Sequence, residues 1–246
     1  MAIVKTQGVV IKKRNLGEAD KILIIFTRDL GKISTVAKGI RKTTSKFSGH
    51  LELLCVTDLL LAEGRNLYTL ISAEISKCFF PIRNDLQHTS RAFLMAEMID
   101  KIAHESEKNH KIYKLFVDSL HELGESKDGL ILPYFQLQLL IEAGFRPHFR
   151  ECMFCQKSLH SEKNYFSVAQ SGILSGEHFR SDLDAIPLGE DEIKLLRFLA
   201  ENSFSQVKKL KIKEDTAEKI NSLLMDYSEY ILESELKSNR FVQRRE

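Results

Sequence analysis

"DKILIIFTRDLGKISTVAK", residues 20–38, is the stretch that decides the fold of the N-terminal part of the chain. It begins with a continuous apolar run at residues 22–26 and continues with alternating apolar and polar residues from Ile33. Between these two parts, Asp29-Leu30-Gly31 is a turn signal. β-Rich runs around a short turn that contains glycine are typical of a hairpin. The stretch therefore predicts two antiparallel strands.

Further strand patterns lie on both sides of this hairpin. Residues 6–14 place Val9 and Ile11 on one face, and residues 51–61 and 67–75 are two more apolar runs, separated by a Glu-Gly-Arg-Asn turn. About five strands in so short a segment predict a five-stranded β-barrel of the OB type. A small β-sandwich is the alternative, because the number of strands alone does not distinguish the two.

After Pro81 the apolar residues repeat with the period of a helix. We expect five or six helices packed as one body, with Gly124 and Gly144 as helix stops. The strongest helical patterns lie at residues 85–103, 110–124, 132–147, 190–202 and 214–238. The predicted fold class is α+β, with an OB-fold domain at residues 1–80 and a helical domain at residues 81–246. A small irregular or β-like insert that contains cysteines is expected at about residues 149–186.

Composition points to an ordinary globular protein, with 43% hydrophobic and 28% charged residues. The first residues lack the long apolar core of a signal peptide, and no apolar run approaches the length of a membrane span. Four cysteines in a chain of this length do not form a disulfide scaffold. These features predict a cytoplasmic protein with reduced thiols.

The net charge of +2 conceals an asymmetry between the two parts of the chain. Residues 1–80 hold 13 lysines and arginines against seven acids, a net charge of +6, which leaves −4 for the other residues. A basic N-terminal domain on a mildly acidic body favours a polyanion as the partner of the first domain.

The basic residues gather in one window, because no acid occurs between Asp29 and Glu52. Cationic side chains that neutralise phosphates, together with aromatic rings that stack on bases, are typical of single-strand binding grooves. Phe47 is therefore either a stacking residue or a small core anchor. The candidate nucleic-acid contacts are Lys32, Lys38, Arg41, Lys42 and Lys46 in this window, and Lys13 and Arg14 in the first predicted loop.

The same region resembles the N-terminal signature of the bacterial RecO family of DNA repair and recombination mediators. The matching motifs are Gly-Glu-x-Asp at 17–20, Phe-Thr followed by Gly-Lys at 26–32, Ala-Lys-Gly-x-Arg-Lys at 37–42, and Ser-Lys-Phe at 45–47. "EAGFRPHFRECMFC", residues 142–155, also resembles the family, whereas the last 60 residues match only in helical character.

The resemblance implies an OB-fold domain, a helical domain and no catalytic centre. It implies binding of single- and double-stranded DNA, annealing of complementary strands and a nucleoid-associated location. It also implies that the partner RecR cooperates in loading RecA onto DNA coated by single-strand binding protein. Carried over by position, Lys38, Arg41, Lys42 and Lys46 are the first DNA contacts to consider. Glu18 and Asp20 could be a carboxylate pair for acid–base catalysis or metal binding, but their place in a turn beside Gly17 favours a structural role.

Cys152 and Cys155 form a Cys-x-x-Cys pair. Some members of the family carry a second such pair, and the two pairs together suit a tetrahedral structural zinc ion. Here Ser175 and His178 stand where the second pair would lie. Three ligands without a fourth make a poor structural site, so we expect no bound cofactor and a metal-free segment held by packing. The alternative is a zinc ion held by Cys152, Cys155 and His178, with His160 as a candidate fourth ligand.

Two further functions remain open at this point. An RNA-binding OB-fold protein would have the same charge pattern. A thiol oxidoreductase using Cys152 and Cys155 is a third hypothesis, although that motif belongs at a strand-to-helix junction of an α/β fold.

Overall fold

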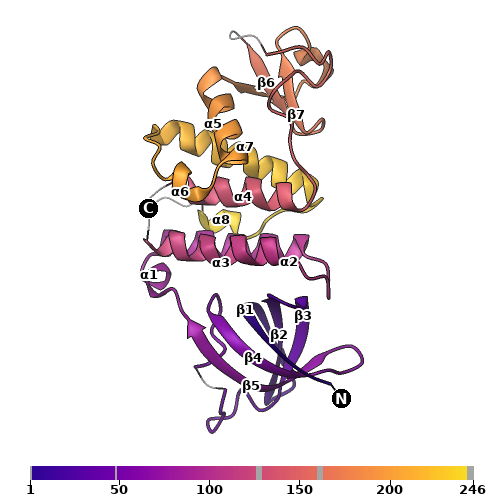
Figure 1. Cartoon of the computed structure of the whole chain (residues 1–246), viewed down its shortest axis with the longest axis vertical. Coiled ribbons are helices and arrows are strands. Elements are labelled where there is room, and N and C mark those ends of the chain that lie inside the picture. The colour runs from indigo at the N-terminus through magenta and orange to yellow at the C-terminus, as the bar shows by residue number, and fades with distance from the viewer. Residues whose placement is uncertain (1, 48, 126–128, 160–162, 243–246) are drawn as a thin grey trace. The chain divides into compact units, whose positions relative to one another are not determined.

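The computed structural model describes residues 2–47, 49–125, 129–159 and 163–242 (Figure 1). The chain divides into two compact units. The first unit comprises Met1–Ser126 with Leu236–Glu246, and the second comprises Lys127–Glu235. The boundary that the sequence favours, at about residue 80, therefore falls inside the first unit, between its barrel and its helices.

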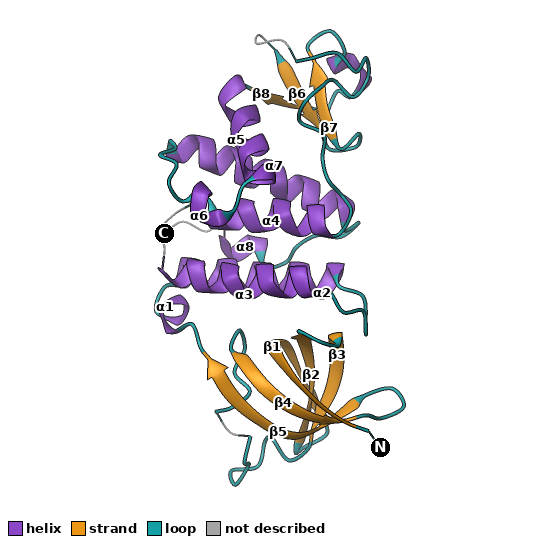
Figure 2. Cartoon of the chain, viewed as in Figure 1, coloured by secondary structure: helices purple, strands orange, loops and turns teal. Residues whose placement is uncertain are grey.

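Five strands form a closed barrel in the first unit, in the order β1-β2-β3-β5-β4 (Figure 2). Neighbouring strands are antiparallel except β3 and β5, which pair in parallel. Closure of the ring gives the OB fold that the sequence predicts and excludes the sandwich. The strands are β1 (Ile3–Leu16), β2 (Asp20–Thr27), β3 (Gly31–Ala37), β4 (Val56–Ala62) and β5 (Tyr68–Lys77).

The predicted hairpin is confirmed as β2 and β3, which pair from Lys21↔Ala37 to Thr27↔Gly31. Gly31 has φ +69°, a left-handed conformation that glycine adopts without steric cost. Alternate side chains of the hairpin point into the barrel, where they pack with residues of the other strands and of the loop that follows β3. The barrel core consists of Val10, Leu23, Ile25, Ile33, Ala37, Phe47, Leu51, Leu59, Leu61 and Leu70.

Part of the outer face of β1 and β2 is also buried, which accounts for Phe26 at the end of the apolar run of β2. Phe26 is 1% exposed, and its ring centroid lies 6.0 Å from that of Tyr113 and 6.5 Å from that of Phe116, both in α3. Val9, its partner in β1, is fully buried, and so is Val10 on the opposite face. The sequence predicts one apolar face of β1, with Val9 and Ile11, but the opposite face is buried as well at Val10.

The helices of the first unit are α1 (Phe80–Arg83), α2 (Leu86–Ile102), α3 (His110–Glu125) and α8 (Asn239–Val242). Helix α3 continues through Gly124, so the prediction that this glycine ends the helix was wrong. The second unit holds α4 (Ile131–Glu142), α5 (Glu190–Glu201), α6 (Phe204–Val207) and α7 (Glu214–Ile231). None of the helices in the described part of the chain has both the length and the apolar character needed to cross a membrane.

The predicted cysteine-containing insert is a small β element of the second unit. Its three strands, β6 (Asn164–Ser167), β7 (Gly172–Ser175) and β8 (Ile186–Leu188), form an antiparallel sheet in the order β7-β6-β8. A single 3₁₀ turn, Phe179–Ser181, separates β7 from β8. The insert lies between α4 and α5, as the sequence predicts.

A disulfide joins Cys55 and Cys78, whose Cα atoms are 4.5 Å apart. The expectation that all thiols are reduced was therefore wrong for this pair. The register of the barrel explains the bond, because β4 and β5 are antiparallel and Val56 pairs with Lys77. Cys55, just before β4, consequently lies opposite Cys78, just after β5.

Candidate nucleic-acid interface and metal centre

Two segments that the β2–β3 hairpin separates in the sequence meet at one end of the barrel. The first is the turn between β1 and β2, residues 17–19; the second is the loop between β3 and β4, residues 38–55, which we call the basic loop. The Gly39 N–H donates to Asp20 Oδ1 at 2.7 Å. Arg41 donates its backbone N–H to the Ala19 carbonyl and its Nη1–H to the Gly17 carbonyl, both at 3.0 Å. Asp20 thus has the structural role in the turn that the sequence predicts.

Four of the predicted DNA contacts are exposed on the basic loop, namely Lys38, Arg41, Lys42 and Lys46. The hydrogen bond to Gly17 fixes the direction of the Arg41 guanidinium and leaves its other N–H groups for a ligand. The Lys46 ammonium lies 5.3 Å from the centroid of the Phe47 ring, a cation–π distance.

Phe47 is an anchor of the basic loop. Its side chain is only 5% exposed and belongs to the barrel core, together with Leu51 of the same loop. The alternative role as a base-stacking residue is therefore wrong for this arrangement. The anchor holds the middle of the loop on the barrel while the neighbouring lysine remains in solvent.

Lys32 differs from the other candidates, because its charge is already engaged. The Lys32 ammonium donates to the Asp100 backbone carbonyl in α2 and lies 3.7 Å from the Asp100 carboxylate, and its side chain is 14% exposed. Lys12 also pairs with Asp100, at 3.0 Å. These contacts make Lys32 a tie between the barrel and α2, and they remove it from the group of free cations.

Lys13 lies half-buried in β1, whereas Arg14 is exposed. Burial lowers the pKa of Lys13; the nearby carboxylate of Glu52 opposes the shift, and Lys21 and Arg83 add to it. Lys13 is thus part of a group of cations that also includes Lys21 and Arg83. Neither Lys21 nor Arg83 is among the contacts predicted from the sequence. The alternation of β2 was a signal for Lys21, but nothing in the sequence placed Arg83 of α1 near the barrel.

The C-terminal end of the basic loop is fixed near the Cys55–Cys78 disulfide. The Leu54 N–H donates to the Val10 carbonyl at 3.1 Å, and Leu53 packs against the barrel core. Arg83 Nη2 lies 3.4 Å from the Leu53 carbonyl and 3.7 Å from Glu52 Oε2. The basic loop is thus tied at its start, middle and end, and its exposed cations are held at one end of the barrel.

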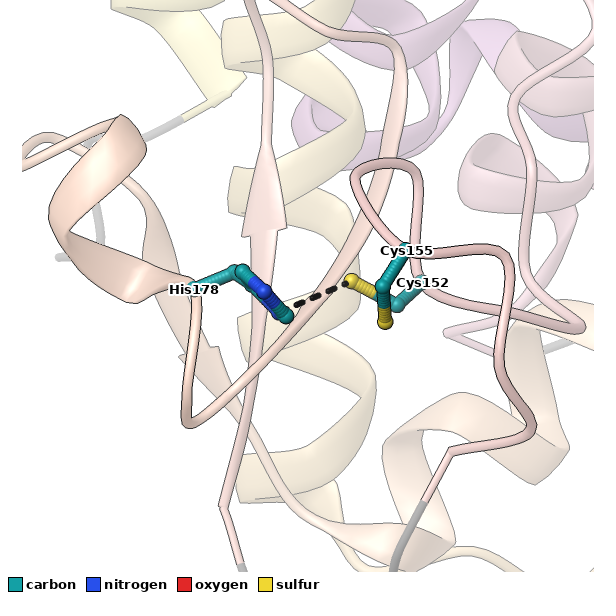
Figure 3. Close-up of side chains that lie close together, drawn as sticks. All are labelled: Cys152, Cys155 and His178. Atoms are coloured by element: carbon teal, nitrogen blue, oxygen red, sulfur yellow. Dashed lines mark hydrogen bonds between the residues drawn. The ribbon is translucent and has the colours of Figure 1, made fainter.

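The second unit contains a group of potential metal ligands (Figure 3). The Sγ atoms of Cys152 and Cys155 and a ring nitrogen of His178 all lie within 4.8 Å of one another. Cys152 and Cys155 belong to a turn before β6, and His178 follows β7. His178 Nδ1 lies 3.8 Å from Cys152 Sγ and 3.0 Å from the hydroxyl of Ser175.

The surroundings of Cys152 favour a thiolate. Burial alone would raise the pKa of Cys152, but backbone N–H groups of Ser175, Cys155 and Phe154 point at its sulfur and lower the pKa to about 6. Two thiolates and an imidazole are the donors that zinc prefers. The described residues include no fourth Cys, His, Asp or Glu in this group, and His160 lies outside the described residues. The described residues thus supply three of the four ligands that zinc takes in structural sites.

Comparison with known proteins gives a match for the N-terminal barrel and a match for the part of the chain that follows it. Residues 1–79 match the family described as Recombination protein O N terminal, and residues 83–240 match Recombination protein O C terminal. The chain is 36% identical to the DNA repair protein RecO of Dehalococcoides mccartyi over 95% of its own length and 92% of the relative's.

Two further relatives carry the same name. The protein from Acetivibrio thermocellus is 29% identical, covering 99% of this chain and 97% of the relative. The protein from Desulforamulus reducens is 30% identical, covering 99% of this chain and 95% of the relative. The matches cover the barrel and the helices alike, so the chain belongs to the RecO family of DNA repair proteins.

Proposed function

We propose that this protein is a non-enzymatic mediator of recombinational DNA repair that captures single- and double-stranded DNA on the basic loop. The observation that carries the proposal is the arrangement of Lys38, Arg41 and Lys42, which are exposed within five residues of one another on a loop tied to the barrel by Asp20 and Gly17. A loop whose backbone is held in place before the ligand arrives loses little backbone conformational entropy on binding a phosphate backbone.

The mechanism that follows is electrostatic. Lys38, Arg41, Lys42 and Lys46 contact phosphates, which are the same in every sequence, so the protein accepts any strand and keeps the base edges free. A strand held by its backbone remains able to pair with a complementary strand, which supports annealing. We further propose RecR and single-strand binding protein as direct partners, RecA loading as the outcome, and the cytoplasm and nucleoid as the location.

Charge reversal tests the proposed DNA site. The double variant Lys38→Glu with Arg41→Glu is expected to weaken binding of a fluorescent single-stranded oligonucleotide strongly and to reduce its salt dependence. The matched control is Lys5→Glu with Lys108→Glu, because both lysines are exposed in the first unit and neither belongs to the basic loop. Equal binding by the folded double variant and the control would refute the site.

Competition between DNA and RNA strands of equal length separates this function from that of an RNA-binding OB-fold protein. Preference for DNA, or no preference, agrees with the proposal, and a clear preference for RNA contradicts it. A disulfide-reductase assay addresses the thiol oxidoreductase. Turnover that disappears in the Cys152→Ser variant would favour that enzyme; we expect none, because Cys152 is fully buried.

We also propose that Cys152, Cys155 and His178 hold a zinc ion with a structural role. The support is the convergence of the three donors from two separate segments, together with the N–H groups that favour a Cys152 thiolate. Elemental analysis of the purified protein is expected to give about one zinc per chain. His178→Gln should lower this content, whereas His148→Gln, which changes an exposed histidine just before the insert, should not. Zinc-free wild-type protein that remains folded would contradict the proposal.

A further inference from the structure

The two sulfurs of the Cys55–Cys78 disulfide have different surroundings. Cys55 is 1% exposed, whereas Cys78 is half-buried at the end of β5. Arg83 Nη2 lies 3.3 Å from Cys55 Sγ. Cys78 follows Lys77, whose ammonium lies over the Phe79 ring at 5.3 Å from its centroid. Cys78 is therefore the more accessible of the two cysteines, and Cys55 is shielded beside a cation.

This asymmetry matters because thiol–disulfide exchange has a direction. A thiolate attacks one sulfur, and the other sulfur leaves as a thiolate. The reachable sulfur is the one that is attacked, and exchange is faster when the leaving thiolate is stabilised. A neighbouring guanidinium favours a thiolate over a thiol. Cys78 thus has the access that an attacked sulfur needs, and Cys55 has the cation that a leaving sulfur needs.

We propose that Cys55–Cys78 is a reversible thiol–disulfide exchange site, whose co-substrate is a dithiol reductant and whose state sets how firmly the basic loop is held. One thiolate of the reductant attacks Cys78 Sγ, the Cys55–Cys78 bond breaks, and Cys55 leaves as a thiolate beside Arg83. The second thiol of the reductant then displaces Cys78. The reductant becomes a disulfide, and the protein gains two electrons and one proton, which leaves Cys78 as a thiol and Cys55 as a thiolate. The reverse reaction restores the bond.

The link to the basic loop follows from the contacts of Arg83. In the disulfide form this side chain lies near the Leu53 carbonyl and pairs with Glu52, both at the end of the loop. A thiolate on Cys55 is a new anion at 3.3 Å that competes for the same guanidinium. Reduction also removes the covalent tie at Cys55, the residue next to Leu54, whose N–H donates to Val10. Both changes loosen the end of the loop.

This inference goes beyond the proposed function, and only its consequence for DNA rests on that function. If the basic loop binds DNA, the disulfide form, with its loop held in place, is expected to bind more tightly than the reduced form. The exchange chemistry and the mobility of the loop are measured without DNA, so a failure of either proposal is recognised separately.

The first experiment identifies the attacked sulfur. Oxidised wild-type protein is exposed briefly to glutathione, quenched with acid, alkylated with iodoacetamide and analysed by peptide mass spectrometry. We expect glutathione on Cys78 and the alkyl group on Cys55. Glutathione mainly on Cys55, or no exchange unless the protein is first unfolded, would overturn the proposal.

The second experiment tests Arg83. Arg83→Met is expected to slow exchange on the order of threefold for each unit by which the pKa of the Cys55 thiol rises. Arg65→Met, which removes an exposed arginine from the β4–β5 turn, is the matched control and should leave the rate unchanged. Equal rates for the two variants would remove the role assigned to Arg83.

The third experiment tests the link to the loop by hydrogen exchange in the oxidised and reduced wild-type protein. The Leu54 and Cys55 amides, which donate to Val10 and Glu52, are expected to exchange at least severalfold faster after reduction. The Ile33 amide in β3 serves as an internal reference. Unchanged exchange at Leu54 and Cys55 would show that the disulfide does not control the loop.

Discussion

The salt dependence of DNA binding gives the sharpest test of the proposed site, because it counts phosphate contacts. The perturbation is a series of neutral substitutions, Lys38→Gln, Arg41→Gln, Lys42→Gln and Lys46→Gln, singly and together. Each removes a positive charge without adding a negative one. The four side chains are exposed on a loop that is anchored in the barrel core by Phe47, so their loss leaves the fold intact.

The expected magnitude follows from the number of exposed cations. Each phosphate contact on a single strand contributes about 0.7 to the slope of log K against log salt concentration, so four contacts contribute about 2.8. Between 50 and 200 mM salt, a slope of about 2.8 corresponds to a loss of affinity of about 50-fold. Each single variant should therefore reduce the slope by about 0.7, and the quadruple variant should remove this part of it.

Lys32 is the internal control that the structure provides. Its ammonium already contacts Asp100 and is largely buried, so it releases no counterion when DNA binds. Lys32→Gln should leave the slope unchanged, although it lowers the stability of the protein. The assay is fluorescence anisotropy of a labelled single strand at five or more salt concentrations. A reduced slope for Lys32→Gln, or an unchanged slope for the quadruple variant, would refute the assignment of contacts.

Three predictions concern the framework that positions the basic loop. Phe26→Ala removes a buried ring from between β2 and α3 and should lower the free energy of unfolding by about 3–5 kcal/mol in urea titrations; a loss below about 1 kcal/mol would contradict the packing described. Asp20→Ala deprives the Gly39 N–H of its acceptor and should cost about 1–2 kcal/mol, whereas Asp20→Asn, which keeps an oxygen, should cost less. Cys55→Ser with Cys78→Ser opens a cross-link between residues 23 apart and should cost about 3 kcal/mol, a loss that a dithiol reductant should reproduce in the wild type.

The barrel was predictable from the sequence because its strands carry local signals. The turn at Gly31 and the alternation after it locate the β2–β3 hairpin without tertiary information. The run Ile22–Phe26 is different, since a run that is apolar at every position requires a partner on each face. One face lies in the barrel, and the other meets Tyr113 and Phe116, which come almost a hundred residues later. The run by itself did not identify this second partner.

The candidate site was predictable in composition but not in geometry. A window without acids identifies Lys38, Arg41 and Lys42, and the structure places them in solvent. The same window includes Lys32, whose charge is neutralised by a residue from α2 that no local pattern relates to it. The Cys55–Cys78 disulfide likewise has no local sequence signal, because it follows from the pairing of β4 with β5.

The contrast between Lys32 and Lys46 shows how this fold separates structural cations from those that are available to a ligand. Lys32 lies within a strand, where its side chain has a fixed direction and meets Asp100. Lys46 lies in a loop whose neighbour Phe47 enters the core, so the backbone is held while the ammonium remains near the ring and solvent. Cations that are fixed at the backbone yet free at the head group can follow the phosphates of either a flexible single strand or a duplex. Under the proposed function, in which the protein holds DNA before and after annealing, this property would be needed, and a rigid groove shaped for one form of DNA would not provide it.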